Sequence, residues 1–208
     1  MEPKSEPFKE MITHFNILTR THRSKFFKVL ETNLNFQTYK NFTHIIGIDD
    51  AKYKTYTSHL SPVLLEKKVK GVDGTFPYNL YLNELYKNVK DGWILFLDDD
   101  DQFYRPDALN ILRARIEDHG EDALYLWKVW FPDYKAVIPR KCFAKEPVRC
   151  DISGIGFCFH SKSIKEAQWD ENKESDYRVI KKLFDYLPKT VWVDLILTEL
   201  QSGQHYGS

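Results

Sequence analysis

Cysteine is scarce in this chain of 208 residues, which has only Cys142, Cys150 and Cys158. Their number is odd and no two form a Cys-x-x-Cys pair, which argues against a disulfide framework and excludes a zinc ribbon. Long apolar runs are also absent, and none approaches the roughly 20 residues that a membrane-spanning helix needs. The charged first ten residues lack the apolar core of a signal peptide. These absences predict a soluble, cytoplasmic protein without a transmembrane segment.

An excess of charge of either sign is missing as well, because 30 Lys and Arg balance 30 Asp and Glu. Without net charge, no global field draws the protein to nucleic acid or to anionic lipid. Surfaces that bind single-stranded nucleic acid alternate Lys or Arg with aromatic residues. The aromatic segments of this chain show no such alternation, so we expect no nucleic-acid partner. Glycine and proline number only nine each and 42% of the residues are hydrophobic, which indicates a globular chain with a core.

Several catalytic motifs are absent too. The chain has no Walker A, Gly-x-Gly-x-x-Gly, His-Glu-x-x-His or Gly-x-Ser-x-Gly sequence, and Gly154-Ile155-Gly156 is only a fragment. NTPase, dehydrogenase, zincin and serine hydrolase functions therefore lack support.

The apolar pattern predicts an α/β order in the first half and a mixed order in the second. Strands are expected at the apolar runs 12–18, 43–48, 93–97, 123–131, 136–138, 155–159 and 191–198. Helices are expected after the N-cap Ser24, and at 76–89, 107–119 and 175–186. The aromatic strands after residue 123 are expected to be antiparallel. We find no second domain boundary and expect a loose leader at 1–10 before one domain at 11–208.

Four consecutive aspartates, Asp98 to Asp101, follow the apolar run Trp93 to Leu97. The carboxyl end of a buried strand is where open α/β sheets bind ligands. Asp98 and Asp100 point to the same side of an extended chain, and such close carboxylates repel unless a cation neutralises them. Oxygen ligands suit Mg²⁺ or Mn²⁺, which commonly bind phosphates as well. The tetrad thus predicts a metal site for a phosphate-bearing ligand, with a solvated acidic loop as the alternative.

Two other acidic sites fit less well. An EF-hand is excluded because Phe103 and Leu109 stand where its loop needs Gly and Glu. A phosphatase of the aspartyl-phosphate type stays remote, because Gln102 stands where Thr or Val is usual.

The segment from Trp93 to Pro106 resembles the DXD region of GT-A glycosyltransferases, family 2 in particular. Four further segments resemble other motifs of the family, and they occur in the family's order. The segment ILTRTHR at 17–23 resembles the nucleotide-binding turn, and IIGIDD at 45–50 resembles the strand that ends in a base- or ribose-binding acid. The segment WDENKESDYR at 169–178 resembles the motif that carries the catalytic base, and QHY at 204–206 resembles a motif with a histidine near the diphosphate. The resemblance implies a single GT-A domain. A Rossmann-like half with a mixed central sheet, at about 11–101, would bind the nucleotide sugar, and an antiparallel half at about 102–208 would bind the acceptor.

The resemblance also implies roles for individual residues. Asp100 is the expected metal ligand, with Asp101 and His205 as further candidates. The nucleotide-side residues are Thr19, Arg20, Arg23, Asp49, Asp50, Asp98 and Asp99. Among these, the arginines could clamp phosphate, Asp98 could contact the ribose or the metal's water shell, and Asp99 points the opposite way and could simply cap the turn. Either Asp49 or Asp50 could contact the nucleoside.

The catalytic base is expected at Asp176 or Glu174, because Ser175-Asp176 stands where the family has Glu-Asp. A helix dipole at the start of the helix would keep Asp176 ionised. The aromatic residues Trp127, Trp130 and Tyr134, with Phe131, could floor an acceptor site or pack in the core.

The expected function is that of a metal-dependent, inverting glycosyltransferase. It would use Mn²⁺ or Mg²⁺ and move a sugar from a nucleoside-diphosphate donor, with UDP favoured, to an acceptor hydroxyl, as on a glycan. Two alternatives remain: a non-catalytic glycan- or protein-binding domain on the same scaffold, and a nucleotidyltransferase, although residues 19–24 lack its Gly-rich loop.

Overall fold

A mixed sheet of nine strands forms the centre of the molecule in the computed structural model, which describes residues 13–68 and 75–201. The strand order is β3-β2-β1-β4-β8-β6-β9-β5, and β7 pairs with β6. The strands are β1 (Phe15–Arg20), β2 (Phe42–Ile48), β3 (Val63–Leu64), β4 (Trp93–Phe96), β5 (Asp101–Phe103), β6 (Ala123–Phe131), β7 (Ala136–Ile138), β8 (Phe157–His160) and β9 (Lys189–Leu200). The expected α/β class is confirmed.

The first half of the chain builds the parallel part of this sheet. Strand β1 lies between β2 and β4 and is parallel to both, and β3 continues the parallel set beyond β2. Helix α1 (Ser24–Phe36) connects β1 to β2. The βαβ pattern read from the sequence is confirmed, and it aligns the carboxyl ends of β1, β2 and β4 at one edge of the sheet.

The second half adds strands of mixed direction. Strand β8 is antiparallel to both β4 and β6, and β7 is antiparallel to β6, as expected from the sequence. Strand β9 runs parallel to β6 and antiparallel to β5. The short strand β5 was not predicted, because it begins inside the acidic run. Its pairing with β9 places Asp101 opposite Leu200.

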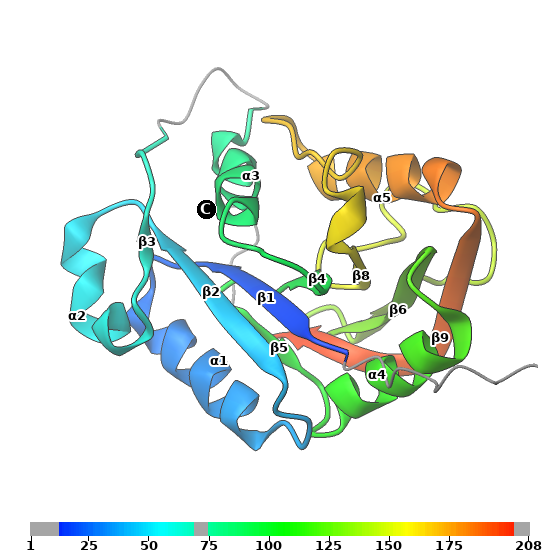
Figure 1. Ribbon diagram of the computed structural model, residues 1–208, viewed down its shortest axis with the longest axis horizontal. Coiled ribbons are helices and arrows are strands. Elements are labelled where there is room, and N and C mark those ends of the chain that lie inside the picture. The colour runs from blue at the N-terminus through cyan, green and yellow to red at the C-terminus, as the bar shows by residue number, and fades with distance from the viewer. Residues whose placement is uncertain (1–12, 69–74, 202–208) are drawn as a thin grey trace, which may run out of the picture.

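Helices cover both faces of the sheet (Figure 1), with α1 and α4 (Ala108–His119) on one and α3 (Leu80–Tyr86) and α5 (Ser175–Tyr186) on the other. Strand β4 supplies both cores: Trp93 and Leu95 pack on the α1 and α4 side, and Ile94 and Phe96 on the α3 and α5 side. This alternation explains why the strand is apolar throughout. The remaining helical segments are short: η1 (Ala51–Tyr53), α2 (Lys54–Thr57), η2 (Ser58–Leu60), η3 (Pro77–Asn79) and η4 (Ser161–Ser163).

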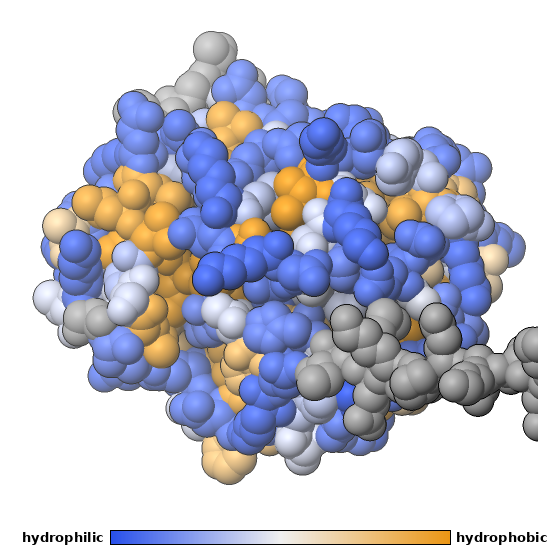
Figure 2. All heavy atoms as spheres, viewed as in Figure 1, coloured by the Kyte–Doolittle hydropathy of each residue, from blue (hydrophilic) through white to orange (hydrophobic). Residues whose placement is uncertain are grey.

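Two helix starts differ from the sequence prediction. Helix α1 begins at Ser24 itself, and Arg23 in extended conformation is its N-cap. The predicted helix at 76–89 is a 3-10 turn, η3, followed by the shorter α3. Within the described ranges, no helix is long and apolar enough to cross a membrane. Polar side chains cover most of the face in Figure 2, and an apolar patch lies near α2 and β3, where Leu64 is 56% exposed.

Candidate functional site

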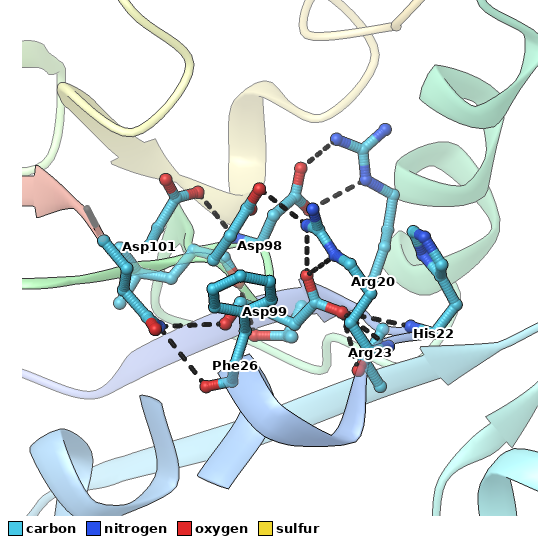
Figure 3. Close-up of polar contacts among 12 residues, drawn as sticks. Arg20, His22, Arg23, Phe26, Asp98, Asp99 and Asp101 are labelled. Carbon is cyan, nitrogen blue, oxygen red and sulfur yellow. Dashed lines mark hydrogen bonds and ion pairs between the residues drawn. The ribbon is translucent and has the colours of Figure 1, made fainter. Parts of the chain in front are cut away.

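The acidic turn between β4 and β5 gathers three carboxylates at one point (Figure 3). The backbone N–H of Asp98 donates to Oδ2 of Asp101 at 2.9 Å, and this bond closes the turn. Asp98, Asp100 and Asp101 each offer one carboxylate oxygen, and these oxygens lie within 4.8 Å of one another. In residues 13–68 and 75–201, no other group of three or more potential metal ligands is found.

Two arginines from the end of β1 and the turn after it pair with these carboxylates. Both oxygens of Asp98 accept from Arg20, whose Nη1 also donates to the carbonyl of Tyr78 at 3.0 Å. Arg23 Nη2 lies 2.6 Å from Oδ2 of Asp100. The tetrad carries a formal charge of −4 and the two arginines +2, so −2 is left for one divalent cation to balance.

Asp99 holds the turn before α1, and Nη2 of Arg23 contacts both its carboxylate and that of Asp100. The Asp99 side chain is 1% exposed. Oδ2 accepts from the Thr21 hydroxyl at 3.0 Å and from the backbone N–H groups of His22 and Arg23 at 3.1 and 3.0 Å. Oδ1 accepts from Nε of Arg23 at 3.0 Å. Asp99 therefore fastens the β1–α1 turn to the acidic turn, which is the capping role its position indicated.

Burial raises the pKa of Asp100, and it raises the pKa of Asp101 well above its ordinary value. The neighbouring aspartates add to both shifts, whereas Arg23 opposes the shift at Asp100. Close, desolvated carboxylates of this kind favour either a proton or a cation between them. The oxygen donors and the residual charge of −2 together fit Mg²⁺ or Mn²⁺.

A pocket of about 330 Å³ opens beside the acidic turn. Asp98, Asp100 and Asp101 line it together with Arg20, and Glu174 and Asp176 line it from the start of α5. The structure thus brings together in one pocket two of the expected metal ligands, Asp100 and Asp101, and both candidates for the catalytic base.

Asp176 lies in the first turn of α5 and is partly buried. Its Oδ2 accepts from the backbone N–H of Gly154 at 3.1 Å, and its Oδ1 from the N–H of Tyr177 at 2.8 Å. Burial nevertheless raises the pKa of Asp176, and the backbone bonds only partly oppose this. The hydrogen bonds from backbone N–H groups at Gly154 and Tyr177 thus offset only part of the effect of burial on this carboxylate.

Glu174 precedes α5 in a left-handed conformation, with φ of 59°. Its carboxylate accepts from Nε of Arg149 and from Sγ of Cys150, the latter at 3.3 Å. The hydrogen bond from Arg149 is the main cause that lowers the pKa of Glu174. An ion-paired carboxylate of lowered pKa is a weaker base than one whose pKa is raised, so the surroundings favour Asp176.

Trp169 forms part of the pocket wall, a role that the sequence analysis missed. Its Nε1 donates to the Tyr86 hydroxyl at 2.9 Å, and its ring meets the Phe96 ring edge to face at 5.1 Å. The Asn83 amide bonds both the N–H and the carbonyl of Trp169, at 2.9 and 2.8 Å. These contacts fix the indole from α3 and β4 at once.

The aromatic residues considered for an acceptor floor lie elsewhere. Trp127 is 1% exposed and donates from Nε1 to the Thr198 hydroxyl in the core. Phe131 packs at the edge of that core, and Tyr134 is 64% exposed. None of these, nor Trp130, lines the pocket. The core alternative thus holds for Trp127.

Five of the seven residues expected on the nucleotide side do not line the pocket: Arg23 and Asp99, described above, and Thr19, Asp49 and Asp50. Thr19 is fully buried and donates its hydroxyl to the carbonyl of Leu97 at 2.6 Å. Asp49 accepts from the Tyr81 hydroxyl at 2.8 Å, and Asp50 caps η1 by accepting from the N–H of Lys52. His205 lies outside the described residues.

Lys173 and Phe76 also line the pocket, and Lys173 Nζ lies 5.5 Å from the centre of the Phe76 ring. Neither residue was singled out in the sequence. Lys173 belongs to the late acidic motif at 169–178, which was the one available signal. Phe76 is brought to the pocket by the bridge between Thr75 and Asn172, a long-range contact that no local pattern indicates.

Gln201 fastens the end of β9 to the acidic turn. Its backbone N–H donates to the carbonyl of Asp100 at 2.8 Å, and its side chain donates to the carbonyl of Asp99 at 3.0 Å. The side chain also reaches the carbonyl of Phe26 in α1 at 3.3 Å. The last described residue thus holds the backbone on which the candidate metal ligands stand.

Comparisons with known proteins show the fold. No protein-family model and no curated protein matches the chain. Among solved structures, S. aureus TarS 1-349 in complex with UDP-GlcNAc matches 93% of this chain with a TM-score of 0.71 at 18% identity. The mannosyltransferase PcManGT from Pyrobaculum calidifontis, in complex with GDP-Man and Mn²⁺, matches 93% with a TM-score of 0.66 at 10% identity.

The chain spans 60% of TarS 1-349, 58% of PcManGT, and 37% of a longer S. aureus TarS chain that it matches with a TM-score of 0.71 at 17% identity. At such identities, the likeness shows a common fold. It confirms the single mixed α/β fold that the sequence resemblance implied.

Proposed function

We propose that this chain is a metal-dependent glycosyltransferase, which moves a sugar from a nucleoside-diphosphate sugar to an acceptor hydroxyl with inversion at the anomeric carbon. The observation that carries the proposal is the pocket in which Asp98, Asp100 and Asp101 share a lining with Asp176. The fold in which this pocket occurs, shared with structures in complex with UDP-GlcNAc and GDP-Man, supports the same assignment.

In this proposal Asp100 and Asp101 hold Mn²⁺ or Mg²⁺, and Asp98 contacts the ion's water shell or the ribose. The ion, when bound, neutralises the charge that builds up on the departing diphosphate. Arg20 orients Asp98 through both carboxylate oxygens and lines the same pocket, where it can approach the phosphates. His205, outside the described residues, is proposed as a further contact to the ion or the diphosphate.

Asp176 is proposed as the base that accepts the proton of the attacking hydroxyl. Its raised pKa makes the ionised carboxylate a better proton acceptor than that of an ordinary aspartate. The N–H groups of Gly154 and Tyr177 fix the orientation of its two oxygens. A single carboxylate would be sufficient for this reaction, because a diphosphate neutralised by the ion would need no acid to leave, and direct attack by the hydroxyl would invert the anomeric carbon.

The donor is proposed to be a UDP-sugar and the acceptor a glycan hydroxyl. The match to S. aureus TarS structures in complex with UDP-GlcNAc and with UDP supports uridine, while PcManGT is in complex with GDP-Man and keeps guanosine as the alternative. The proposed donor half at about 11–101 and acceptor half at about 102–208 both contribute to the pocket, through Asp100 from one and Asp176 from the other.

Thermal unfolding tests the proposal with UDP, GDP and their sugar derivatives, each with and without Mn²⁺. A nucleotide at 100 times its dissociation constant stabilises the folded state by about 2.7 kcal/mol, which raises the melting temperature by roughly 5 to 10 °C in a chain of this size. We expect this rise for one nucleotide with Mn²⁺ in the wild type and in Asp118→Asn, an acidic position on α4 that does not line the pocket. The rise should be absent in Asp100→Asn.

Three outcomes would contradict the proposal. If no nucleotide raises the melting temperature, or if Asp100→Asn responds as the wild type does, the pocket is not a donor site. If turnover of the bound nucleotide releases pyrophosphate instead of the nucleoside diphosphate, the reaction is nucleotidyl transfer.

A further inference from the structure

Lys173 lies in the loop before α5, between two residues that are held in place. On one side, Asn172 pairs with Thr75 in an isolated β-bridge, and its carbonyl accepts from Nδ2 of Asn79 at 3.2 Å. On the other side, the carboxylate of Glu174 is held by the ion pair described above. Lys173 itself is exposed and lines the pocket. Its backbone is thus fixed at the pocket by its neighbours, and its own side chain takes no part in fixing it.

The ammonium group of Lys173 forms no ion pair within residues 13–68 and 75–201. It lies over the ring of Phe76, with Nζ 5.5 Å from the ring centre, and Phe76 lines the pocket too. A cation is attracted to the face of an aromatic ring, and this contact leaves its three N–H donors available for other acceptors. Phe76 therefore keeps the ammonium group at the pocket without neutralising its charge.

The positive charges that line the pocket are few. Among the described residues of the lining, only Arg20 and Lys173 are cationic, and Arg20 donates to both oxygens of Asp98, which offsets its charge. One divalent ion would bring the acidic turn and its two arginines from −2 to zero, and Asp176 adds a further carboxylate to the lining. The negative charge of a nucleoside diphosphate would thus be offset, within the described lining, by Lys173.

We propose that Lys173 is a binding residue for the diphosphate of the donor, which its ammonium group contacts from the loop before α5. An ammonium group binds phosphate as a point charge with rotatable donors, so it needs no fixed fork geometry. The pocket volume of about 330 Å³ is at the small end of the range of about 300 to 1,000 Å³ for ligand sites, so a diphosphate beside the acidic turn would also lie near this loop. The inference rests on the proposed function, because it needs the nucleotide in this pocket.

The test measures the dissociation constant of UDP at saturating Mn²⁺ by titration calorimetry, at low and at high ionic strength. GDP replaces UDP if it is the nucleotide that stabilises the protein. At low ionic strength we expect Lys173→Gln to bind the nucleotide about tenfold more weakly than the wild type, because one charge-assisted contact to the phosphates is lost. At high ionic strength the difference should shrink, since salt screens the contact of an exposed ammonium group in the wild type.

Two further variants complete the design. Lys182→Gln removes the same charge from an exposed position on α5 that does not line the pocket, and it should leave the affinity for the nucleotide unchanged. Lys173→Arg keeps a cation at the same place and should retain the wild-type affinity within about threefold. Because both lysines are exposed, we expect all three variants to unfold at the wild-type temperature without ligand, which thermal unfolding checks.

The possible failures can be told apart. If the wild type binds neither UDP nor GDP in the presence of Mn²⁺, the proposed function fails, and the inference with it. If the wild type binds one of them and Lys173→Gln binds it with the same affinity, the inference alone is overturned. An equal loss of affinity at low and high ionic strength would also overturn it, because the lysine would then support the shape of the pocket instead of binding the phosphates.

Discussion

At the scale of single residues, Asp176 and Glu174 line the same pocket, but we expect their substitution to have different effects on turnover. Burial raises the pKa of Asp176, whereas the ion pair with Arg149 lowers that of Glu174. Removing a general base typically slows the reaction by about 10²- to 10⁴-fold. We expect Asp176→Asn to lower kcat for donor turnover by at least about 100-fold, with an unchanged dissociation constant for the donor.

Donor turnover is measured as release of the nucleoside diphosphate, with water as the acceptor, and donor affinity by calorimetry in the presence of Mn²⁺. Glu174→Gln is the matched variant and should lose less than about tenfold, since the carboxylate is engaged by Arg149 and Cys150. A larger loss in Glu174→Gln than in Asp176→Asn would exchange the two roles. An equal loss of donor affinity in both variants would mean that they bind the donor instead.

At the scale of elements, α3 is joined to the late loop before α5 by the side chain of Asn83. Its amide donates to the carbonyl of Trp169 and accepts from the N–H of the same residue. Each such hydrogen bond contributes about 1 kcal/mol. We therefore expect Asn83→Ala to lower the free energy of unfolding by about 2 kcal/mol and, because Trp169 lines the pocket, to weaken ligand binding too.

Urea denaturation measures the first effect and donor titration the second. Asn88→Ala, an exposed position just beyond α3, is the control and should change neither. If Asn83→Ala loses stability but binds the donor as the wild type does, the contact supports the fold without positioning the pocket wall.

Elements with a strong local pattern were predictable, and contacts between distant elements were not. Strands β1 and β4 follow from their apolar runs, and α5 from its periodic apolar residues. By contrast, β5 begins at Asp101, inside a run of charge, and is a strand only because β9 pairs with it. No local pattern predicts such a strand, since its stability comes from residues almost 100 positions later in the sequence.

The candidate site shows the same division. The position of the acidic tetrad at the end of β4 was readable from the sequence, because a buried strand ends there. The opposite surroundings of Asp176 and Glu174 were not readable, since they depend on Gly154 and Arg149 from a separate loop. The pairing of Arg23 with Asp99 likewise joins residues 76 positions apart.

At the scale of the whole molecule, the formal net charge is zero, but some groups ionise differently in the folded and the unfolded chain. His44 on β2 is the clearest case, because burial lowers its pKa to about 4 from 6.5. Its ring stacks on Phe27 at 6.0 Å, and its Nε2 lies 2.8 Å from the Thr19 hydroxyl. The fold thus holds this imidazole neutral between β2 and α1.

The consequence is a loss of stability in mild acid. Between pH 6.5 and 4 the unfolded chain binds a proton at His44 and the folded chain does not, so the stability present above pH 6.5 is lost as the pH falls toward 4. For one such group, partly accessible to solvent, the loss from pH 7 to pH 5 amounts to about 1 to 2 kcal/mol.

His44→Gln keeps a polar partner for Thr19 but cannot titrate, so its free energy of unfolding should fall by that much less over the same range. Urea denaturation at the two pH values measures the difference, with His59→Gln, whose ring is 55% exposed, as the control. Equal pH dependence in wild type and His44→Gln would show that His44 is not held neutral by the fold.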